Sequence, residues 1–368
     1  MDAKEIRKQV VEYVDNIVNE HVEKEKATYD LVRFSTMSHN LYHFMPSIPD
    51  KEHWNIYKTA LRNRILSNNQ DFHLTYDFRA ILTNVTKSML EPYLPGIFAT
   101  FHFGERCGYF FPLVREEINI ALISGYEGDG LKKKTEEVDK ETAFTKRFYP
   151  DSTAKIELLS YKSKNLFFDM IKKQRAGSSI MWFQDWANTY VNPDECVEVD
   201  FLNKKILVPK GMALFSYMTK SPIVPWFSFY DDQMLPQCVI GQVITPGRMT
   251  LNEYVPYAMQ KLYHELERHV RAHYDQWEGW FNIHRFMTGM QPASATKETV
   301  NAGLHKNYKY NEAACMFKID KSFFVMNRIN GRLVEIDRDN VDRIEQRRFA
   351  EMKPEELGIL YKNGILIN

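Results

Sequence analysis

Residues 96–104 read GIFATFHFG, a short apolar run that ends at a histidine and a glycine. Short apolar runs of this kind predict buried strands, and longer helical stretches separate them along the chain. Strand–helix–strand units imply a mostly parallel sheet flanked by helices, so the sequence predicts an α/β fold. The other predicted strands lie at 118–124, 154–160, 178–184, 222–229 and 236–244, with a helix at 160–175 that ends near Gly177.

Outside this core, the pattern changes at both ends of the chain. Residues 1–95 are expected to be a helical region that packs on the core, because apolar residues recur at helical spacing over 4–25. A long amphipathic helix is expected at 250–273. Near the C-terminus, Asn330-Gly331 is a strong hairpin signal. The predicted domains are therefore a helical region at 1–95, an α/β core at 96–290, a linker at 291–304 and a small α+β winged-helix-like domain at 305–368.

Composition excludes several classes of protein. The 368 residues carry 48 basic and 48 acidic side chains, and this zero net charge argues against nucleic acid as a partner. The four cysteines lie far apart without zinc-type spacing, so we expect no metal and a cytoplasmic location. No apolar run approaches the length that crosses a bilayer, so any membrane contact, at the inner membrane, is expected to be peripheral.

One histidine of the core sits where a parallel sheet binds its ligands. His102 follows a predicted strand, and such sheets take ligands at the carboxyl ends of their strands. Histidine exchanges its proton near neutral pH, so His102 is a candidate general base, with Glu105 as a carboxylate that orients the ring. The alternative interpretation is a hydrogen-bonded structural histidine beside aromatic residues.

Several motifs carry a resemblance to a known family. The segments are HFGERCGYFFPL at 102–113, FLNKK at 201–205, PKGMA at 209–213, SPIVPWF at 221–227 and QWEGWFNIHR at 276–285. In this order they resemble the lipid A lauroyl/myristoyl acyltransferases of the lysophospholipid acyltransferase superfamily, over roughly residues 80–290. The resemblance implies a glycerolipid acyltransferase-like fold. It also implies acyl transfer from acyl carrier protein or coenzyme A as co-substrate, with no permanently bound cofactor.

The sequence departs from the family at one catalytic position. The family places a carboxylate five residues after the histidine, where this chain has Cys107, while Glu105 is only three residues away. Glu105 is our first choice for the residue that holds His102, since a carboxylate at that spacing on a helix can reach the ring. Cys107 is either a nucleophile that carries the acyl group with His102 as its base, or a small buried apolar residue. A third alternative is an acyl-chain or peptide binding protein without turnover.

Three further residues are candidates for substrate binding. Arg106 can bind a phosphate or carboxylate, or stabilise the oxyanion, although an exposed arginine is the default. Asp185 follows the strand at 178–184, where the family has an Asp-Gln pair and this chain has Gln184-Asp185; we expect it to line the acceptor pocket. Trp182 is one of several aromatics that either wall an acyl-chain channel or belong to the core.

The C-terminal segment carries a second resemblance. Residues 323–337 and 357–366 resemble the small peptide-recognition domains of peptide-maturation enzymes, which bind a leader peptide as an added strand; a dimerisation or lid element is the alternative. The family members anchor at the membrane through an apolar N-terminal helix, whereas the helix expected at 4–25 is charged throughout its polar face and only moderately apolar. We therefore expect an acyltransferase that acts on an amine or hydroxyl of a biosynthetic intermediate, with a small molecule, lipid or peptide as acceptor.

Overall fold

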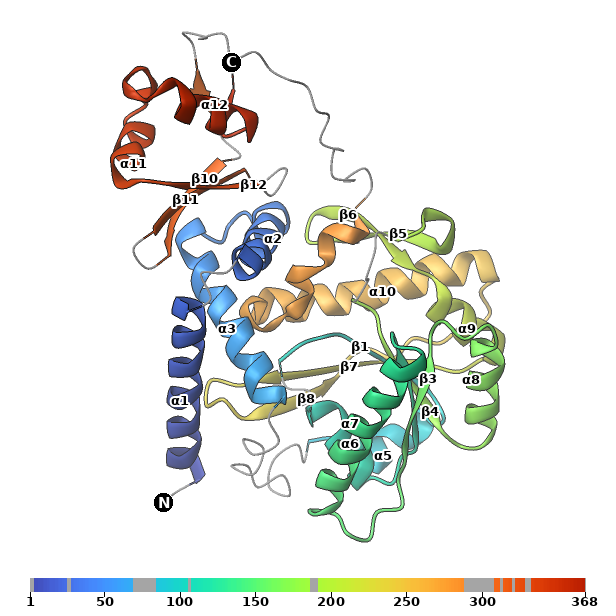
Figure 1. Cartoon of the computed structure of the whole chain (residues 1–368). Helices are drawn as coiled ribbons and strands as arrows, with labels where there is room; N and C mark the ends of the chain where they lie inside the picture. Colours follow the sequence, from blue (N-terminus) through green and yellow to red (C-terminus); the bar gives the residue numbers. More distant parts are fainter. Residues whose placement is uncertain are drawn as a thin grey trace. The chain divides into compact units, whose positions relative to one another are not determined.

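The computed structural model describes most of the chain (Figure 1). The described residues are 3–24, 28–68, 84–104, 107–185, 191–287, 308–311, 314–319, 322–327 and 332–367. The predicted linker at 291–304 and the Asn330-Gly331 turn lie outside them. Within these ranges, no helix combines the length and the apolar character needed to cross a bilayer.

Two compact units make up the chain, and each combines two stretches of sequence. The first unit contains Met1–Asn16 and Thr59–Thr288, and the second contains Ile17–Lys58 and Gly289–Asn368. This division groups residues 17–58 with the C-terminal segment, unlike the predicted domains at 1–95, 96–290 and 305–368, which stay predictions.

Helices form the N-terminal part of the chain, as predicted. They are α1 (Ala3–Lys24), α2 (Thr28–Phe44) and α3 (Asp50–Asn68). Residues 69–83 lie outside the described part, and after them the structure describes α5 (Lys87–Leu90) and a 3₁₀ turn at Glu91–Tyr93.

A six-stranded sheet forms the core of the first unit. Its strand order is β3-β2-β4-β1-β7-β8, and every neighbouring pair is parallel except β7 with β8. The predicted α/β fold with a mostly parallel sheet is therefore confirmed. The strands are β1 (Ile97–Thr100), β2 (Ile120–Ser124), β3 (Ile156–Ser160), β4 (Ser179–Phe183), β7 (Ile223–Tyr230) and β8 (Pro236–Ile240).

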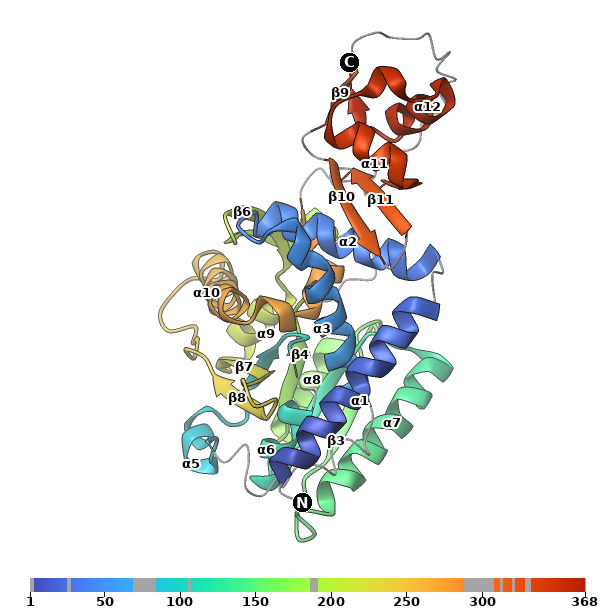
Figure 2. The same cartoon turned by 90° about the vertical axis from the view of Figure 1, so that its left-hand side faces the viewer.

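Helices cover both faces of this sheet (Figures 1 and 2). Strands β1 and β2 are buried at every position. A strand covered on both faces has no side that meets solvent, and this is why their sequences are nearly continuous apolar runs. On one face, Phe101 and Phe227 stack on each other and Phe101 also meets Tyr263 of α10. The other face packs against α6 and α7. The helices of the sheet are α6 (Cys107–Arg115), α7 (Gly128–Lys146), α8 (Leu166–Arg175), α9 (Gly211–Thr219) and α10 (Leu251–Ala272), and an antiparallel pair, β5 (Cys196–Phe201) and β6 (Lys204–Pro209), precedes α9.

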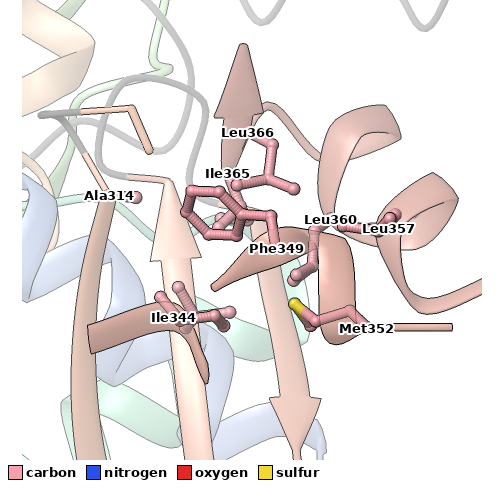
Figure 3. Packing of buried hydrophobic residues seen from close by; sticks show 9 residues of the cluster. Ala314, Ile344, Phe349, Met352, Leu357, Leu360, Ile365 and Leu366 are labelled. Atoms are coloured by element: carbon pink, nitrogen blue, oxygen red, sulfur yellow. The ribbon is translucent and has the colours of Figure 1, made fainter. Parts of the chain in front are cut away.

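The C-terminal segment of the second unit is a small α+β fold with its own core. A three-stranded antiparallel sheet, β10-β11-β12, and a two-stranded pair, β13-β9, combine with two helices. Figure 3 shows the apolar side chains between these elements, with Phe349 close to Leu360 and Ile365. The elements are β9 (Lys309–Tyr310), β10 (Ala314–Ile319), β11 (Ser322–Asn327), β12 (Arg332–Ile336), α11 (Arg338–Glu345), α12 (Pro354–Lys362) and β13 (Leu366–Ile367).

Candidate active site

The carboxyl edge of the parallel sheet brings His102 and Asp185 together. Strands β1 and β4 pair in parallel with Thr100 opposite Phe183, so the residues two positions further along each strand also lie opposite each other. The His102 Nδ1 atom lies 2.8 Å from Asp185 Oδ1. Two chain segments separated by 83 residues thus build a histidine–carboxylate pair at the edge where parallel sheets bind ligands.

Three donors hold the Asp185 carboxylate. In addition to the imidazole, the His102 backbone N–H and the Trp277 indole Nε1–H both donate to Asp185 Oδ2, each at 2.8 Å. The Asp185 side chain is only 1% exposed, whereas that of His102 is 20% exposed. A buried carboxylate needs such partners to stay ionised, and here they also fix its orientation toward the ring.

The loop after β1 takes a conformation that only glycine adopts easily. Gly104 has φ +51, and a Cβ there would lie 2.5 Å from Phe229 Cα. The buried Tyr109 hydroxyl, from the first turns of α6, lies within donating distance of the Phe101 carbonyl at 2.5 Å and of the Phe103 carbonyl at 2.8 Å, and it accepts from the Phe103 N–H at 3.0 Å. The sharp turn and this hydroxyl together hold the backbone on either side of His102.

A distant segment closes the other side of this loop. Phe103 and Trp277 form an antiparallel bridge, with Gly104 N–H donating to the Gln276 carbonyl and Glu278 N–H donating to the His102 carbonyl. The Gln276 side-chain amide makes two further bonds, to the backbone N–H and carbonyl of Tyr230 on β7. We call residues 102–104 and 276–278 together the closing ribbon. It fixes the histidine loop to the sheet.

The geometry sets the chemistry available to the imidazole. With Nδ1 donating its proton to the carboxylate, the neutral ring carries its lone pair on Nε2, which is the arrangement of a general base. The Phe183 ring lies beside the imidazole, with the centroids 4.5 Å apart, and restricts its rotation. The ring is therefore oriented by a carboxylate on one side and by an aromatic on the other.

The structure describes some of the predicted site residues and leaves others outside the described part. Glu105 and Arg106 lie outside the described residues, so their roles stay predictions. Cys107 is the first residue of α6, and its side chain is outside the described part. The Nδ1 bond that Glu105 was expected to make is made by Asp185, which was expected to line the acceptor pocket. Trp182 is half-buried on β4, where its ring lies over Gly211 at the start of α9.

Sequence reasoning missed the role of Trp277 and Gln276. Both lie in the stretch 276–285, which sequence reasoning singled out only for its resemblance to an acyltransferase motif. The fully buried Trp277 is 92 residues away from Asp185 along the chain, so no local pattern links the two. The motif itself was the signal that could have led to them.

Metal ligands and reactive cysteines were the other candidates for a functional site in the described residues. No three histidine, cysteine, aspartate or glutamate side chains in the described ranges are grouped to hold a metal ion. Burial raises the pKa of Cys196 to about 11, which keeps this thiol protonated and unreactive at neutral pH. Burial likewise raises the pKa of Cys238 well above its ordinary value.

Comparisons with known proteins add no assignment: no protein-family model matches the chain, and no curated protein matches its sequence.

Proposed function

We propose that the protein is an acyltransferase that moves a fatty acyl group from an acyl thioester to an amine or hydroxyl of a biosynthetic intermediate. One observation carries the proposal: a partly exposed histidine is held by a buried carboxylate, His102 Nδ1 to Asp185 Oδ1 at 2.8 Å. Acyl carrier protein or coenzyme A would deliver the acyl group as co-substrate, and no permanently bound cofactor or metal is required.

In the proposed reaction, the acceptor nitrogen or oxygen bonds to the thioester carbonyl carbon while its proton passes to His102 Nε2. The carbon–sulfur bond then breaks, and the proton returns from the imidazole to the leaving thiolate. Asp185 keeps the ring in the required tautomer and stabilises the imidazolium that forms between the two steps. General base catalysis of this kind contributes about 10²–10⁴-fold to the rate.

The resemblance to lipid A lauroyl/myristoyl acyltransferases supports the same activity, and the position of Asp185 supports it at the point where the sequence departs from the family. The carboxylate that the family carries five residues after the histidine is absent, since Cys107 stands there. Asp185 supplies a carboxylate from the neighbouring strand instead. The N-terminus of α6 follows the histidine loop, and the partial positive charge of a helix N-terminus favours a developing oxyanion.

The C-terminal α+β fold supports a peptide among the acceptors. Its sheet β10-β11-β12 has two edge strands, and an extended peptide can add to such an edge through main-chain hydrogen bonds. Lipids and small molecules remain part of the proposal. We place the activity in the cytoplasm, with membrane contact at most peripheral to the inner membrane.

The test compares the wild type with His102→Ala and Asp185→Asn. Each is incubated with acyl-coenzyme A and acyl carrier protein thioesters and with amine and hydroxyl acceptors, and transfer is followed by intact-mass spectrometry. We expect His102→Ala to lose about 10²–10⁴-fold of the transfer rate. Asp185→Asn should lose a comparable part of it, because the amide favours the wrong imidazole tautomer. Circular dichroism checks that both variants fold.

Two outcomes would contradict this mechanism. If the wild type and His102→Ala transfer acyl groups equally slowly, the chain is a binding protein for acyl chains or peptides rather than an enzyme. If the wild type accumulates an acyl adduct that Cys107→Ser abolishes, Cys107 is a nucleophile and His102 its base.

A further inference from the structure

The two edge strands of the six-stranded sheet, β3 and β8, are protected to different degrees. β8 begins at Pro236, which has no N–H to offer, and the Asn84 side-chain amide donates to the Cys238 carbonyl of the same strand. A proline and a covered carbonyl both keep an edge strand from pairing with another chain. The β8 edge is therefore closed.

The β3 edge has no such protection. Its five residues, Ile156–Ser160, include no proline or lysine, and no other described strand pairs with its outer side. The last three of them are half-buried. The one charged side chain, Glu157, is bound by Lys173 Nζ at 2.7 Å, which neutralises its charge. β3 is thus an open edge of the kind that pairs with another strand.

The ladder between β2 and β3 fixes which backbone groups of β3 point outward. The Ile120 N–H donates to the Lys155 carbonyl, and the Tyr161 N–H donates to the Ser124 carbonyl. Residues 155 and 161 therefore direct their N–H and C=O toward β2, and so do the odd-numbered residues between them, because these groups alternate in direction along a strand. Leu158, at the centre of β3, directs both groups to the open side.

A strand with this pattern is complementary to a copy of itself. In an antiparallel pair related by a two-fold axis, Leu158 faces Leu158 of the partner subunit, and the two residues exchange both hydrogen bonds. Residue 156 of each copy then faces residue 160 of the other, and these residues also direct their backbone groups outward. The register that centres on Leu158 thus pairs outward groups with outward groups along the whole strand.

The helix beside this edge carries charges that fit the same two-fold axis. α7 packs on β3, while α6 packs on β7 and β8, and Phe144 of α7 contacts Phe111 of α6. Lys132 and Asp139 lie about two turns of α7 apart, so they share one face, and that face is turned away from Phe144 and toward the open edge. Both side chains are exposed. Two copies of α7 that run antiparallel across the axis bring each lysine to the aspartate of the other copy.

We infer that two copies of the chain form a symmetric dimer through β3. The Leu158 N–H donates to the carbonyl of Leu158 of the partner subunit and the reciprocal bond forms as well, so that the two sheets join into one. On each side of the axis, Lys132 forms an ion pair with Asp139 of the partner subunit. The candidate site lies away from this interface, because β2 and β4 separate β3 from β1.

The experiment measures the mass of the whole chain by sedimentation velocity over about a hundred-fold range of concentration. The wild type is compared with Lys132→Asp, with Asp139→Lys and with the variant that carries both substitutions. Lys133→Asp is the matched control, because Lys133 is exposed on α7 but points in another direction. Circular dichroism checks that the variants fold, and hydrogen exchange is followed at the Leu158 amide.

We expect the wild type to sediment at twice the 43.5 kDa mass of one chain. Each single substitution places two pairs of like charges across the interface and should weaken dimerisation by about 10-fold or more. The variant with both substitutions restores opposite charges and should return to within about 3-fold of the wild-type dissociation constant. Lys133→Asp should match the wild type. The Leu158 amide should exchange slowly in the dimer and fast in diluted, monomeric protein.

Three results would overturn the inference. A wild-type chain that stays monomeric at every concentration excludes the dimer. A dimer that the single substitutions leave unchanged, or that the combined variant does not restore, is not held by this face of α7. A dimer in which the Leu158 amide exchanges as fast as in the monomer is not joined through β3.

Discussion

At the scale of single residues, the candidate site depends on one carboxylate with three donors. If Asp185 lost one of these hydrogen bonds, its carboxylate would rotate, and the imidazole bound to it would change its orientation as well. Of the three donors, the Trp277 indole is the one that a substitution removes without touching the histidine or the backbone. It therefore offers a test of whether the geometry of the pair matters.

Trp277→Phe should lower kcat/KM for acyl transfer by about 10-fold or more, since a hydrogen bond to a charged group is worth about 1.5–3 kcal/mol. The loss should lie mainly in kcat, because Trp277 positions Asp185 and is not expected to touch substrate. Trp280→Phe is the matched control: this indole is equally buried, but it donates to the Tyr274 carbonyl. Similar kinetic losses in both variants would show a merely structural role for Trp277.

The sequence predicted the histidine but not its partners. His102 could be recognised because it ends an apolar strand, which is a local signal. Asp185 was noticed at the end of its own strand, but the register that sets it opposite His102 is a property of the folded sheet. Periodicity along the chain carries no information on which strand ends become neighbours, so the pairing could not be derived.

At the scale of elements, the closing ribbon depends on Gly104. Its left-handed backbone and its closeness to Phe229 both exclude a side chain. Gly104→Ala should therefore lower the free energy of unfolding by more than the roughly 1–2 kcal/mol that left-handed backbone costs alone, and should reduce acyl transfer. Gly128→Ala is a control with φ +52 and open space around its Cβ. Urea unfolding of both variants measures the difference, and equal losses would refute the steric part of this argument.

The predicted elements match the structure where the signal is local. All six apolar runs became strands of the main sheet, and the helix at 250–273 became α10. The β5–β6 hairpin was not predicted, because its turn is Leu202-Asn203 rather than a pair with glycine. Both turn residues have positive φ, 49 and 65, as two-residue hairpin turns of this type require, although a leucine seldom adopts it. Leu202 is buried, so packing compensates for the strain.

At the scale of the whole molecule, buried histidines couple the stability of the first unit to pH. Burial lowers the pKa of His269 and of His284 to about 4, from the ordinary 6.5. Between about pH 4 and pH 6.5, these two histidines therefore bind more protons in the unfolded chain than in the folded chain. The stabilisation is complete above pH 6.5 and is lost as the pH falls toward 4, by up to about 1.4 kcal/mol per pH unit for each ring. Asp275 acts against this trend, because burial raises the pKa of its carboxyl.

His269→Gln should flatten this dependence. The buried His269 ring packs on Phe227, with the centroids 4.1 Å apart, whereas His264 lies exposed on the same helix. Urea unfolding at about pH 7 and about pH 5 should give a smaller difference for His269→Gln than for the wild type. His264→Gln should keep the wild-type slope. An unchanged slope in His269→Gln would mean that the ring has the same pKa in the folded and the unfolded chain, and would contradict this prediction.

The closing ribbon has a consequence for how the protein is made. Ribosomes deliver the chain from its N-terminus, so β1 and β4 emerge well before residues 276–278 do. A nascent chain that has already exposed both His102 and Asp185 still lacks the Trp277 indole and the backbone partners of the histidine loop. The hydrogen bonds around His102 and Asp185 are therefore complete only when translation of the first unit is nearly finished.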